Sequence, residues 1–332
     1  LSLDKQQQTV KPNSLPKIRQ ADGSFRQVSW EEGFQYVADK LKELQEKYGK
    51  ESVAGISTGQ LTMEEFAIFG HVMRNYLQTN VDGNTRLCMA TAVVAHKQSY
   101  GFDAPGFTLK DLELSDRIIF IGANPVVADP ILWGRVRQNQ APGHKIIVID
   151  PRRSETAMNA DHWYGLKWRS DLLLLYTIAH LLIEKDYLDH RFIEEHTEHF
   201  EEFKEFVKAY TLERGAKGTG LSEEQILELV ELIHSGKRVS FWWTMGVNQG
   251  YEAVRTAQAI INLALMTGNI GKPGTGANSI TGQCNAMGSR SFSNTTVFYG
   301  GGDFADPARR ARIAEVLHVP EEMLAKKPTI TY

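Results

Sequence analysis

Cys88 is the residue whose type and setting first suggest chemistry, because a thiolate can bind a soft metal ion. It follows Arg86 by two residues and precedes a helix that the pattern predicts over residues 90–100. A nearby cation and a helix N-terminus both favour the thiolate form of a cysteine. A lone cysteine beside apolar residues is also a common core residue, so this segment alone leaves both interpretations open.

Three polar loops supply further groups that can bind a ligand. The apolar runs 118–121, 146–149 and 239–243 lead into loops that begin at Gly122, Asp150 and Thr244. None of them contains a Gly-x-Gly-x-x-Gly turn, a Walker lysine loop or a Gly-x-Ser-x-Gly elbow. By motif the chain is therefore not a nicotinamide dehydrogenase, a kinase or an esterase.

The elements that must position these loops alternate between strand and helix. Apolar helices are predicted around residues 131–138, over 172–183 and up to about residue 266, each after an apolar strand. Continuous apolar strands alternating with helices are typical of a parallel sheet covered on both faces, and ligands bind beyond the carboxyl ends of such strands. We therefore expect the three loops to converge on one ligand.

The segments on either side of this region are less regular. After an extended lead-in of about 25 residues, the pattern predicts a helix from residue 30, a strand over 52–57 and a helix over 63–77. Residues 268–302 are rich in Gly, Asn, Ser and Thr and are predicted to form a long functional loop. The acidic stretch 194–205, with His196 and His199, is interpreted as a solvated helix face rather than a metal site.

Composition limits the remaining classes. The chain has 332 residues, enough for about two domains, with 42% hydrophobic and 23% charged residues and a formal charge of -3. A net charge of this sign does not indicate binding to nucleic acid or to an anionic membrane. No apolar run approaches the ~18 residues of a membrane span. The opening residues do not resemble a signal peptide, so a cytoplasmic location is expected, with a periplasmic one left open.

Several separated segments resemble the bis(molybdopterin guanine dinucleotide) oxidoreductases of the dimethyl-sulfoxide-reductase superfamily. Segment 86–92 is similar to the molybdenum-ligand segment of the nitrate reductases, in which Met follows the Cys. Segment 282–290 (GQCNAMGSR), preceded by GKPGTG at 271–276, is similar to a segment of bacterial and cyanobacterial assimilatory nitrate reductases. The loops at Gly122 and Asp150, and Asp171 at the start of a helix, follow in the order this superfamily shows.

The resemblance implies both a fold and a cofactor. It implies a doubly wound α/β domain over residues 86–281, inserted into a second α/β molybdopterin-binding domain made of residues 1–85 and 282–332. It also implies a molybdenum ion bound by two pyranopterin dithiolenes and by Cys88. The positions that it assigns to the cofactor are Asn84, Arg86, Gly122, Asn124, Asp150, Arg153, Thr156, Asp171, Gly246, Asn248, Gln249, Gly282, Gln283 and Asn285.

Within that set, the roles follow from the parts of the cofactor. Asn124, Arg153 and Thr156 are expected at a phosphate or a pterin edge. Asp150 and Asp171 are expected to accept hydrogen bonds from guanine. Each carboxylate also has a structural alternative, because Asp-Pro is a common turn and Asp171 could cap its helix.

Two features depart from the resemblance. With two cysteines, the chain cannot supply the four ligands of a [4Fe–4S] cluster, which we expect instead in a longer enzyme of which this chain is the central portion. That longer enzyme is expected to continue beyond residue 332. Cys284 stands where the similar segment has Pro, and we interpret it as having no ligand role.

The resemblance favours reduction of nitrate to nitrite by oxygen-atom transfer. Met89 and Thr281 stand where formate dehydrogenases of the superfamily have His and Arg, which argues against formate oxidation. Arg290 is the candidate anchor for nitrate, with Met89 and Met245 as polarisable walls. Formate dehydrogenase or another oxyanion reductase remains the first alternative, and a cofactor-free scaffold subunit the second. The electron donor is expected to be a ferredoxin, a flavodoxin or a nicotinamide-linked subunit.

Overall fold

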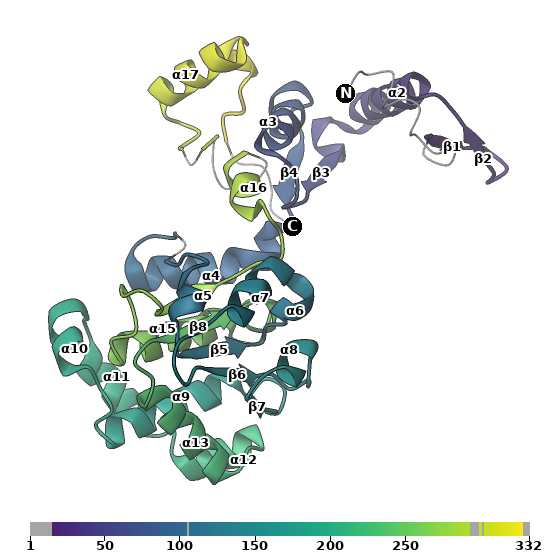
Figure 1. Cartoon of the computed structure of the whole chain (residues 1–332). Helices are drawn as coiled ribbons and strands as arrows, with labels where there is room; N and C mark the ends of the chain where they lie inside the picture. The colour runs from purple at the N-terminus through teal and green to yellow at the C-terminus, as the bar shows by residue number, and fades with distance from the viewer. Residues whose placement is uncertain (1–14, 105, 293–298, 301, 328–332) are drawn as a thin grey trace. The chain divides into compact units, whose positions relative to one another are not determined.

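The computed structural model describes residues 15–104, 106–292, 299–300 and 302–327 (Figure 1). The chain divides into two compact units. The central unit comprises Asn84–Ala286, and the flanking unit combines Leu1–Gly83 with Met287–Tyr332. The sequence-based domain boundaries were 85/86 and 281/282, and the assignment of each unit to molybdopterin binding stays a prediction.

A five-stranded sheet forms the centre of the central unit. The strands are β5 (Arg117–Ile121), β6 (Lys145–Ile149), β7 (His162–Tyr164), β8 (Val239–Trp243) and β9 (Gly276–Ser279). They pair in parallel in the order β7-β6-β5-β8-β9. The chain therefore winds outward from β5 in one direction and then returns to β8 on its other side, as in doubly wound folds. The predicted α/β fold with a parallel sheet is confirmed.

Alternate strand residues pack on opposite faces of this sheet, because successive side chains of a strand point to opposite sides. On one face, Ile119 and Phe241 join a core with α4 (Thr85–Tyr100), α9 (Asp171–Glu184), α13 (Glu223–His234) and α15 (Ala253–Met266). On the other face, Phe120 and Trp242 pack with α5 (Asp111–Leu114), α7 (Pro130–Arg137) and α8 (Glu155–Met158). Figure 1 shows these helices on both sides of the strands.

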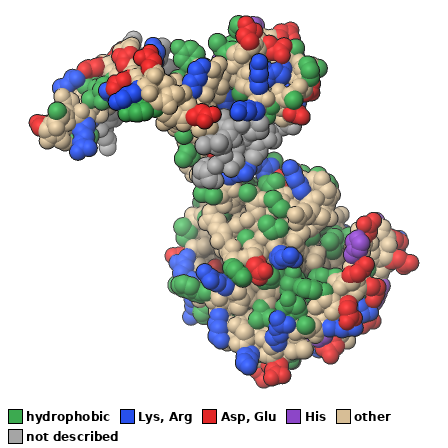
Figure 2. All heavy atoms as spheres, turned by 180° about the vertical axis from the view of Figure 1, so that it is seen from behind, with side chains coloured by type: hydrophobic (Ala, Val, Ile, Leu, Met, Phe, Trp, Pro, Cys, Tyr) green, Lys and Arg blue, Asp and Glu red, His purple; other side chains and the backbone are tan. Residues whose placement is uncertain are grey.

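Shorter helices complete the central unit. They are α6 (Pro125–Ala128), α10 (His190–His196), α11 (Phe200–Val207), α12 (Leu212–Thr219) and α14 (Met245–Asn248). Six glutamates of the stretch 194–205 are exposed, and acidic and histidine side chains gather at this edge in Figure 2. His199 lies 3.3 Å from Glu202 and His196 lies 3.8 Å from Glu195, so the stretch is a solvated face as predicted.

The flanking unit has smaller sheets. It contains the hairpin β1 (Lys17–Arg19) and β2 (Phe25–Gln27), and the parallel pair β3 (Ala54–Ser57) and β4 (Asn80–Gly83). Its helices are α2 (Trp30–Tyr48), α3 (Met63–His71) with the π-helical turn Val72–Tyr76, and α17 (Pro307–Leu317), with single 3-10 turns at Lys50–Ser52 and Glu321–Met323. Helix α16 (Ala286–Phe292) begins at the last residue of the central unit.

Hydrogen bonds join the two sequence segments of the flanking unit. The Asn75 side chain donates to Tyr299 Oη at 2.8 Å and accepts from the Ala325 backbone N–H at 3.1 Å. Arg74 donates to the carbonyl of Phe292 at 3.2 Å. In the part of the chain that the structure describes, no helix has the length and apolar character needed to cross a membrane.

Candidate active site

Two glycines bring the loops after β5 and β8 into direct contact at the point where the strand order reverses. The Gly246 N–H donates to the carbonyl of Gly122 at 3.1 Å, and the Thr244 hydroxyl donates to the same oxygen at 3.0 Å. A Cβ on Gly246 would lie 2.6 Å from the Gly122 Cα, and Gly122 itself has φ +54°. Only glycine fits at both positions, because the two backbones pack directly against each other, and both glycines line a cavity.

Cys88 lies at this edge, within the first turns of α4. The helix begins at Thr85, five residues earlier than predicted, because the Asn84 carbonyl accepts the Cys88 N–H at 3.2 Å. The half-buried Cys88 Sγ lies 3.3 Å from Met245 Sδ in α14 and 3.3 Å from Thr281 Oγ1 after β9. Three segments far apart in sequence thus meet at one sulfur atom.

Hydrogen bonds hold α4 against the loop after β8. Thr91 Oγ1 donates to the Asn248 carbonyl at 2.6 Å, and Gln249 Nε2 donates to the Leu87 carbonyl at 3.3 Å. The Asn248 side chain is buried and accepts from Trp243 Nε1 at 3.0 Å. Among the predicted cofactor residues, Asn248 and Gln249 therefore act within the protein here, since they fix the helix that carries Cys88.

Asn124 and Thr156 are brought together after β5 and β6. Asn124 Oδ1 accepts from the Thr156 hydroxyl at 2.8 Å and from its N–H at 3.1 Å, while Asn124 Nδ2 donates to Glu155 at 2.8 Å. The exposed Arg153 guanidinium lies 5.7 Å from the ring centroid of Trp163. Sequence reasoning missed Glu155 and Trp163, because glutamate on a helix and tryptophan on a strand carry no ligand signal by themselves.

Asp150 and Asp171 line one cavity of about 230 Å³ next to Gly122 and Gly246. Burial raises the pKa of both carboxyl groups, and the nearby Asp150 charge raises the pKa of Asp171 further. Ser170 occupies the N-cap position of α9 and Asp171 follows it as the first helical residue, so the cap position is not held by Asp171. Two partly buried carboxyl groups in one cavity suit a ligand with N–H donors.

The cavity also has an aromatic and cationic rim that sequence reasoning missed. Trp168, Arg169 and Tyr251 line it, with Trp168 and Tyr251 exposed and the Arg169 guanidinium 5.7 Å from the Tyr251 ring centroid. Arg169 has φ +65°, which an arginine seldom adopts. The adjacent Trp-Arg pair before the apolar helix was the one signal in the sequence.

Two buried oxygens near the site have no hydrogen-bond partner in the structure. They are Asn84 Oδ1, just before α4, and Gln283 Oε1, in the loop after β9. Both residues were predicted to bind the cofactor, and unpaired buried acceptors fit a ligand that brings N–H donors. The Gln283 N–H points to Thr281 Oγ1 at 3.4 Å, and a Cβ on Gly282 would lie 3.1 Å from the Ala128 carbonyl.

The described residues contain no group of three or more His, Cys, Asp or Glu side chains that could hold a metal ion. A metal at Cys88 would therefore take its other ligands from outside these side chains. This matches a cofactor that carries its own sulfur donors, and the cavity lined by the two glycines and the unpaired acceptors fit such a group.

The remaining predicted residues are placed as follows. Arg290 lies in the part of α16 that belongs to the flanking unit, and it is half-buried. Arg86, Met89 and Asn285 are also half-buried.

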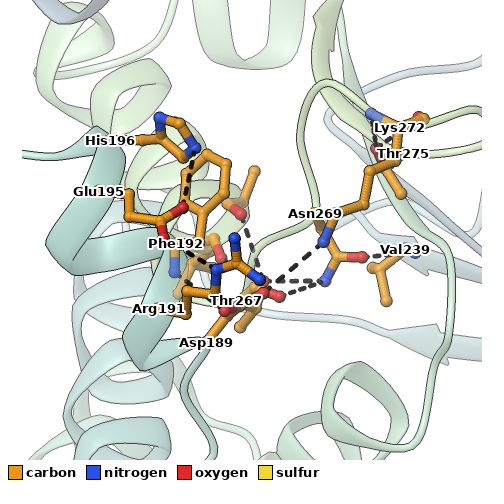
Figure 3. Close-up of polar contacts among 12 residues, drawn as sticks. Asp189, Arg191, Phe192, Glu195, His196, Val239, Thr267, Asn269, Lys272 and Thr275 are labelled. Carbon is orange, nitrogen blue, oxygen red and sulfur yellow. Dashed lines mark hydrogen bonds and ion pairs between the residues drawn. The ribbon is translucent and has the colours of Figure 1, made fainter.

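The Gly-rich run 271–276 lies at the opposite edge of the sheet, because it leads into the start of β9. Asn269 Oδ1 accepts from the Val239 N–H at 3.0 Å, and Lys272 pairs with Asp189 at 3.6 Å (Figure 3). The Gly274 N–H donates to Asp111 at 2.8 Å. The expectation of one long functional loop over 268–302 is wrong for its first part. The run 271–276 ties the amino ends of the strands together and leads into β9.

The family described as Molybdopterin oxidoreductase matches residues 14–329. The nitrate reductase of Synechocystis sp. (strain ATCC 27184 / PCC 6803 / Kazusa) is 33% identical over 314 residues, which are 93% of this chain and 44% of that protein. Formate dehydrogenase H of Escherichia coli (strain K12) is 33% identical over 303 residues, which are 90% of this chain and 42% of that protein.

Two further comparisons agree. The assimilatory nitrate reductase of Haloferax mediterranei is 34% identical over 310 residues, which are 93% of this chain and 43% of that protein. The solved structure of acetylene hydratase from Pelobacter acetylenicus has a TM-score of 0.59 and 26% identity, and covers 76% of this chain and 34% of that chain. The chain thus spans less than half the length of these relatives. With strand-end loops that meet at Cys88 and a family match along nearly its whole length, this chain belongs to the molybdopterin oxidoreductase family.

Proposed function

We propose that this chain is the metal-binding part of a molybdenum-dependent enzyme that reduces nitrate to nitrite at a bis(molybdopterin guanine dinucleotide) cofactor. The single observation that supports it best is the convergence of Thr281 and Met245 on the Cys88 sulfur. Both neighbours are uncharged. A thiolate beside an uncharged hydroxyl and a thioether is a soft metal ligand with no adjacent base.

The residues that would hold the cofactor lie at the carboxyl edge of the sheet. Gly122 and Gly246 line the cavity, where their backbone would meet a phosphate or a pterin. Asp150 and Asp171 would accept from a guanine edge in their shared cavity. Asn124 with Thr156, and the exposed Arg153, would meet phosphate. Each of these assignments follows from the chemistry of the donor or acceptor that the side chain presents.

When bound, the cofactor supplies a two-electron metal centre that takes an oxygen atom from the substrate. The chain's own residues have simpler roles in our proposal. Cys88 donates charge to the metal, Met89 and Met245 provide polarisable walls, and Arg290 attracts the planar anion through the two parallel N–H groups of its guanidinium. Gln283, through its unpaired Oε1, orients a donor group of the cofactor.

Formate oxidation is the main alternative, because nitrate reductases and formate dehydrogenases are similar to this chain at nearly equal identity. Formate oxidation needs a group that accepts a proton and a cation that holds the carboxylate. Met89, beside Cys88, and Thr281, in contact with its sulfur, supply neither. A cofactor-free scaffold is the second alternative, although a scaffold has no physical reason to keep Cys88, Asn124 and Asp171 together.

The longer protein is expected to contain a [4Fe–4S] cluster outside this chain and to receive electrons from a ferredoxin, a flavodoxin or a nicotinamide-linked subunit in the cytoplasm. The test is metal analysis of the full-length protein, followed by activity assays with nitrate and with formate under a common artificial electron donor or acceptor. We expect bound molybdenum and turnover of nitrate but not formate. Turnover of formate alone would favour the first alternative, and absence of molybdenum the scaffold.

A further inference from the structure

We infer that Thr281 is a positioning residue whose hydroxyl donates a hydrogen bond to the Cys88 sulfur. The two atoms lie 3.3 Å apart, within hydrogen-bond range for sulfur, and both residues are half-buried. Nothing in the sequence marks Thr281 for this role. The inference rests on the proposed function only for its consequence at the metal, since the contact itself belongs to the protein.

The direction of this hydrogen bond follows from the other neighbour of the sulfur, because the Cys88 S–H donates to Met245 Sδ, which has no proton of its own to give. Thr281 Oγ1 accepts the Gln283 backbone N–H at 3.4 Å through one lone pair, and its single hydroxyl proton stays available for an acceptor. The Cys88 sulfur is in range of that proton. Because a backbone donor polarises the hydroxyl, the O–H becomes a better donor toward sulfur.

The second neighbour of the sulfur cannot replace Thr281. Met245 Sδ lies 3.3 Å from Cys88 Sγ, but a thioether has no proton to donate. The contact is favourable while Cys88 carries its S–H, which can point to Met245. Once Cys88 is a thiolate, Thr281 is the one of these two neighbours that can donate a hydrogen bond to the sulfur. The Thr281 hydroxyl therefore matters most in the thiolate form of Cys88, which is the form that binds a metal.

The backbone around Thr281 fixes the hydroxyl in place. The Ile280 N–H donates to the Trp243 carbonyl at 3.0 Å, which extends the pairing of β9 with β8 by one residue, and the Ile280 side chain is buried. Threonine also has few χ1 rotamers because it is β-branched. Strand β9 therefore positions the donor, and α14, which follows β8, positions Met245 on the same sulfur.

Hydrogen bonds to a ligand thiolate withdraw charge from the sulfur and so weaken its donation to the metal. The metal potential then becomes more positive. An uncharged donor achieves this without adding a charge beside the sulfur. Thr281 thereby tunes Cys88 as a ligand, and its removal should make the sulfur both a stronger nucleophile and a stronger donor.

The first test uses the metal-free chain with Cys284→Ser, which leaves Cys88 as its single cysteine. Alkylation by iodoacetamide is measured at a pH where the thiol is fully ionised. We expect Thr281→Val and Thr281→Ala to react about two- to threefold faster than the parent, as for the loss of one weak hydrogen bond. Thr281→Ser keeps the hydroxyl and should react at the parent rate. Thr197→Val is the matched control, because its hydroxyl bonds to the Ile193 carbonyl in α10, away from the sulfur.

The second test uses the loaded full-length enzyme and measures the molybdenum midpoint potential. We expect a more negative potential in Thr281→Val and the parent value in Thr281→Ser, at equal molybdenum content. Equal alkylation rates and equal potentials in Val, Ser and parent would overturn the inference and leave Thr281 a packing residue. A protein without molybdenum, or one that oxidises formate, would contradict the proposed function while the alkylation rates still decide the inference.

Discussion

Among the single residues of the site, Asp150 and Asp171 form an energetically unfavourable arrangement. Two partly buried carboxyl groups share one small cavity, and burial raises the pKa of each. Asp150 accepts the Arg152 N–H at 2.8 Å, but ionising both partly buried carboxyl groups in one cavity is still unfavourable. We therefore propose that a ligand brings hydrogen-bond donors to this cavity.

Asp171→Asn tests that interpretation through stability and cofactor content. Because the folded-state pKa of Asp171 is raised, the folded chain binds protons more readily than the unfolded one, and this contribution to stability is lost as pH rises through that pKa. We expect Asn to be more stable than Asp at neutral pH, with the difference vanishing below the ordinary aspartate pKa of 3.8. The Ala variant should weaken guanine binding by about 1–3 kcal/mol.

Denaturant unfolding at several pH values, with measurement of bound nucleotide, checks this prediction. Glu184→Gln, an exposed change at the other end of α9, is the control and should leave both quantities unchanged. Equal cofactor content in the Asp, Asn and Ala forms would reduce Asp171 to a residue of the first helical turn.

Arg290 is the residue on which substrate attraction depends in our proposal. Arg290→Lys keeps the charge and loses the planar pair of donors, so KM for nitrate should rise more than kcat falls. Arg290→Ala should lower kcat/KM by about 2–5 kcal/mol if the site excludes water. Steady-state kinetics with nitrate measure KM and kcat for both variants. Arg312→Ala, at an exposed position of α17, is the control. Unchanged nitrate kinetics in Arg290→Ala would remove it from the mechanism.

At the scale of elements, the loops after β5 and β8 form the frame of the site. Gly246→Ala would place a Cβ 2.6 Å from the Gly122 Cα, where backbone rather than a flexible side chain must shift. We expect a loss of about 1–3 kcal/mol in unfolding free energy and reduced cofactor content. Gly134→Ala in α7 is the matched control, since its Cβ meets nothing within 4 Å and should stabilise the helix by about 0.5–1 kcal/mol.

Thermal or denaturant unfolding of both variants measures this difference. A Gly246→Ala chain as stable as the parent, with full cofactor content, would show that the two loops separate easily and do not form a rigid frame.

The same elements show which parts of the fold the sequence predicts. Strands β5, β6 and β8 are long apolar runs, so their pattern is sufficient. Strand β9 (Gly276–Ser279) has the sequence GANS, whose residues have low strand propensity, and it forms because it pairs with the buried β8. The start of α4 was predicted too late because Asn84 and Thr85 follow the buried β4, which the sequence did not reveal.

In the candidate site, local features of the sequence named candidate residues, but contacts between distant segments could not be predicted. Resemblance and position after a strand identified Cys88, Asn124 and Asp171, since these features are local. Contacts between distant segments were not predictable, and they include the Thr281 hydroxyl at the Cys88 sulfur and the rim formed by Trp168 and Tyr251. Such contacts depend on how β8, β9 and α4 pack, which no single segment encodes.

At the scale of the whole molecule, the chain is a central unit inserted between two segments of a flanking unit, and it spans less than half the length of its relatives. The central unit holds Cys88 and the cavity with two carboxylates, and the flanking unit holds Arg290. Metal binding is therefore proposed for one unit and substrate attraction for the other.

The central claim is that Cys88 binds molybdenum for nitrate reduction, and the two cysteines of the chain provide a direct test. In the full-length protein we expect Cys88→Ala to abolish nitrate reduction while the pterin dinucleotide stays largely bound, because the cofactor's own sulfurs remain as ligands. Cys284→Ala, at an exposed position, should retain activity. The measurement is nitrate turnover of both variants, together with their molybdenum and nucleotide content. Near-normal turnover by Cys88→Ala would contradict the role of Cys88 as a metal ligand and make it a packing residue.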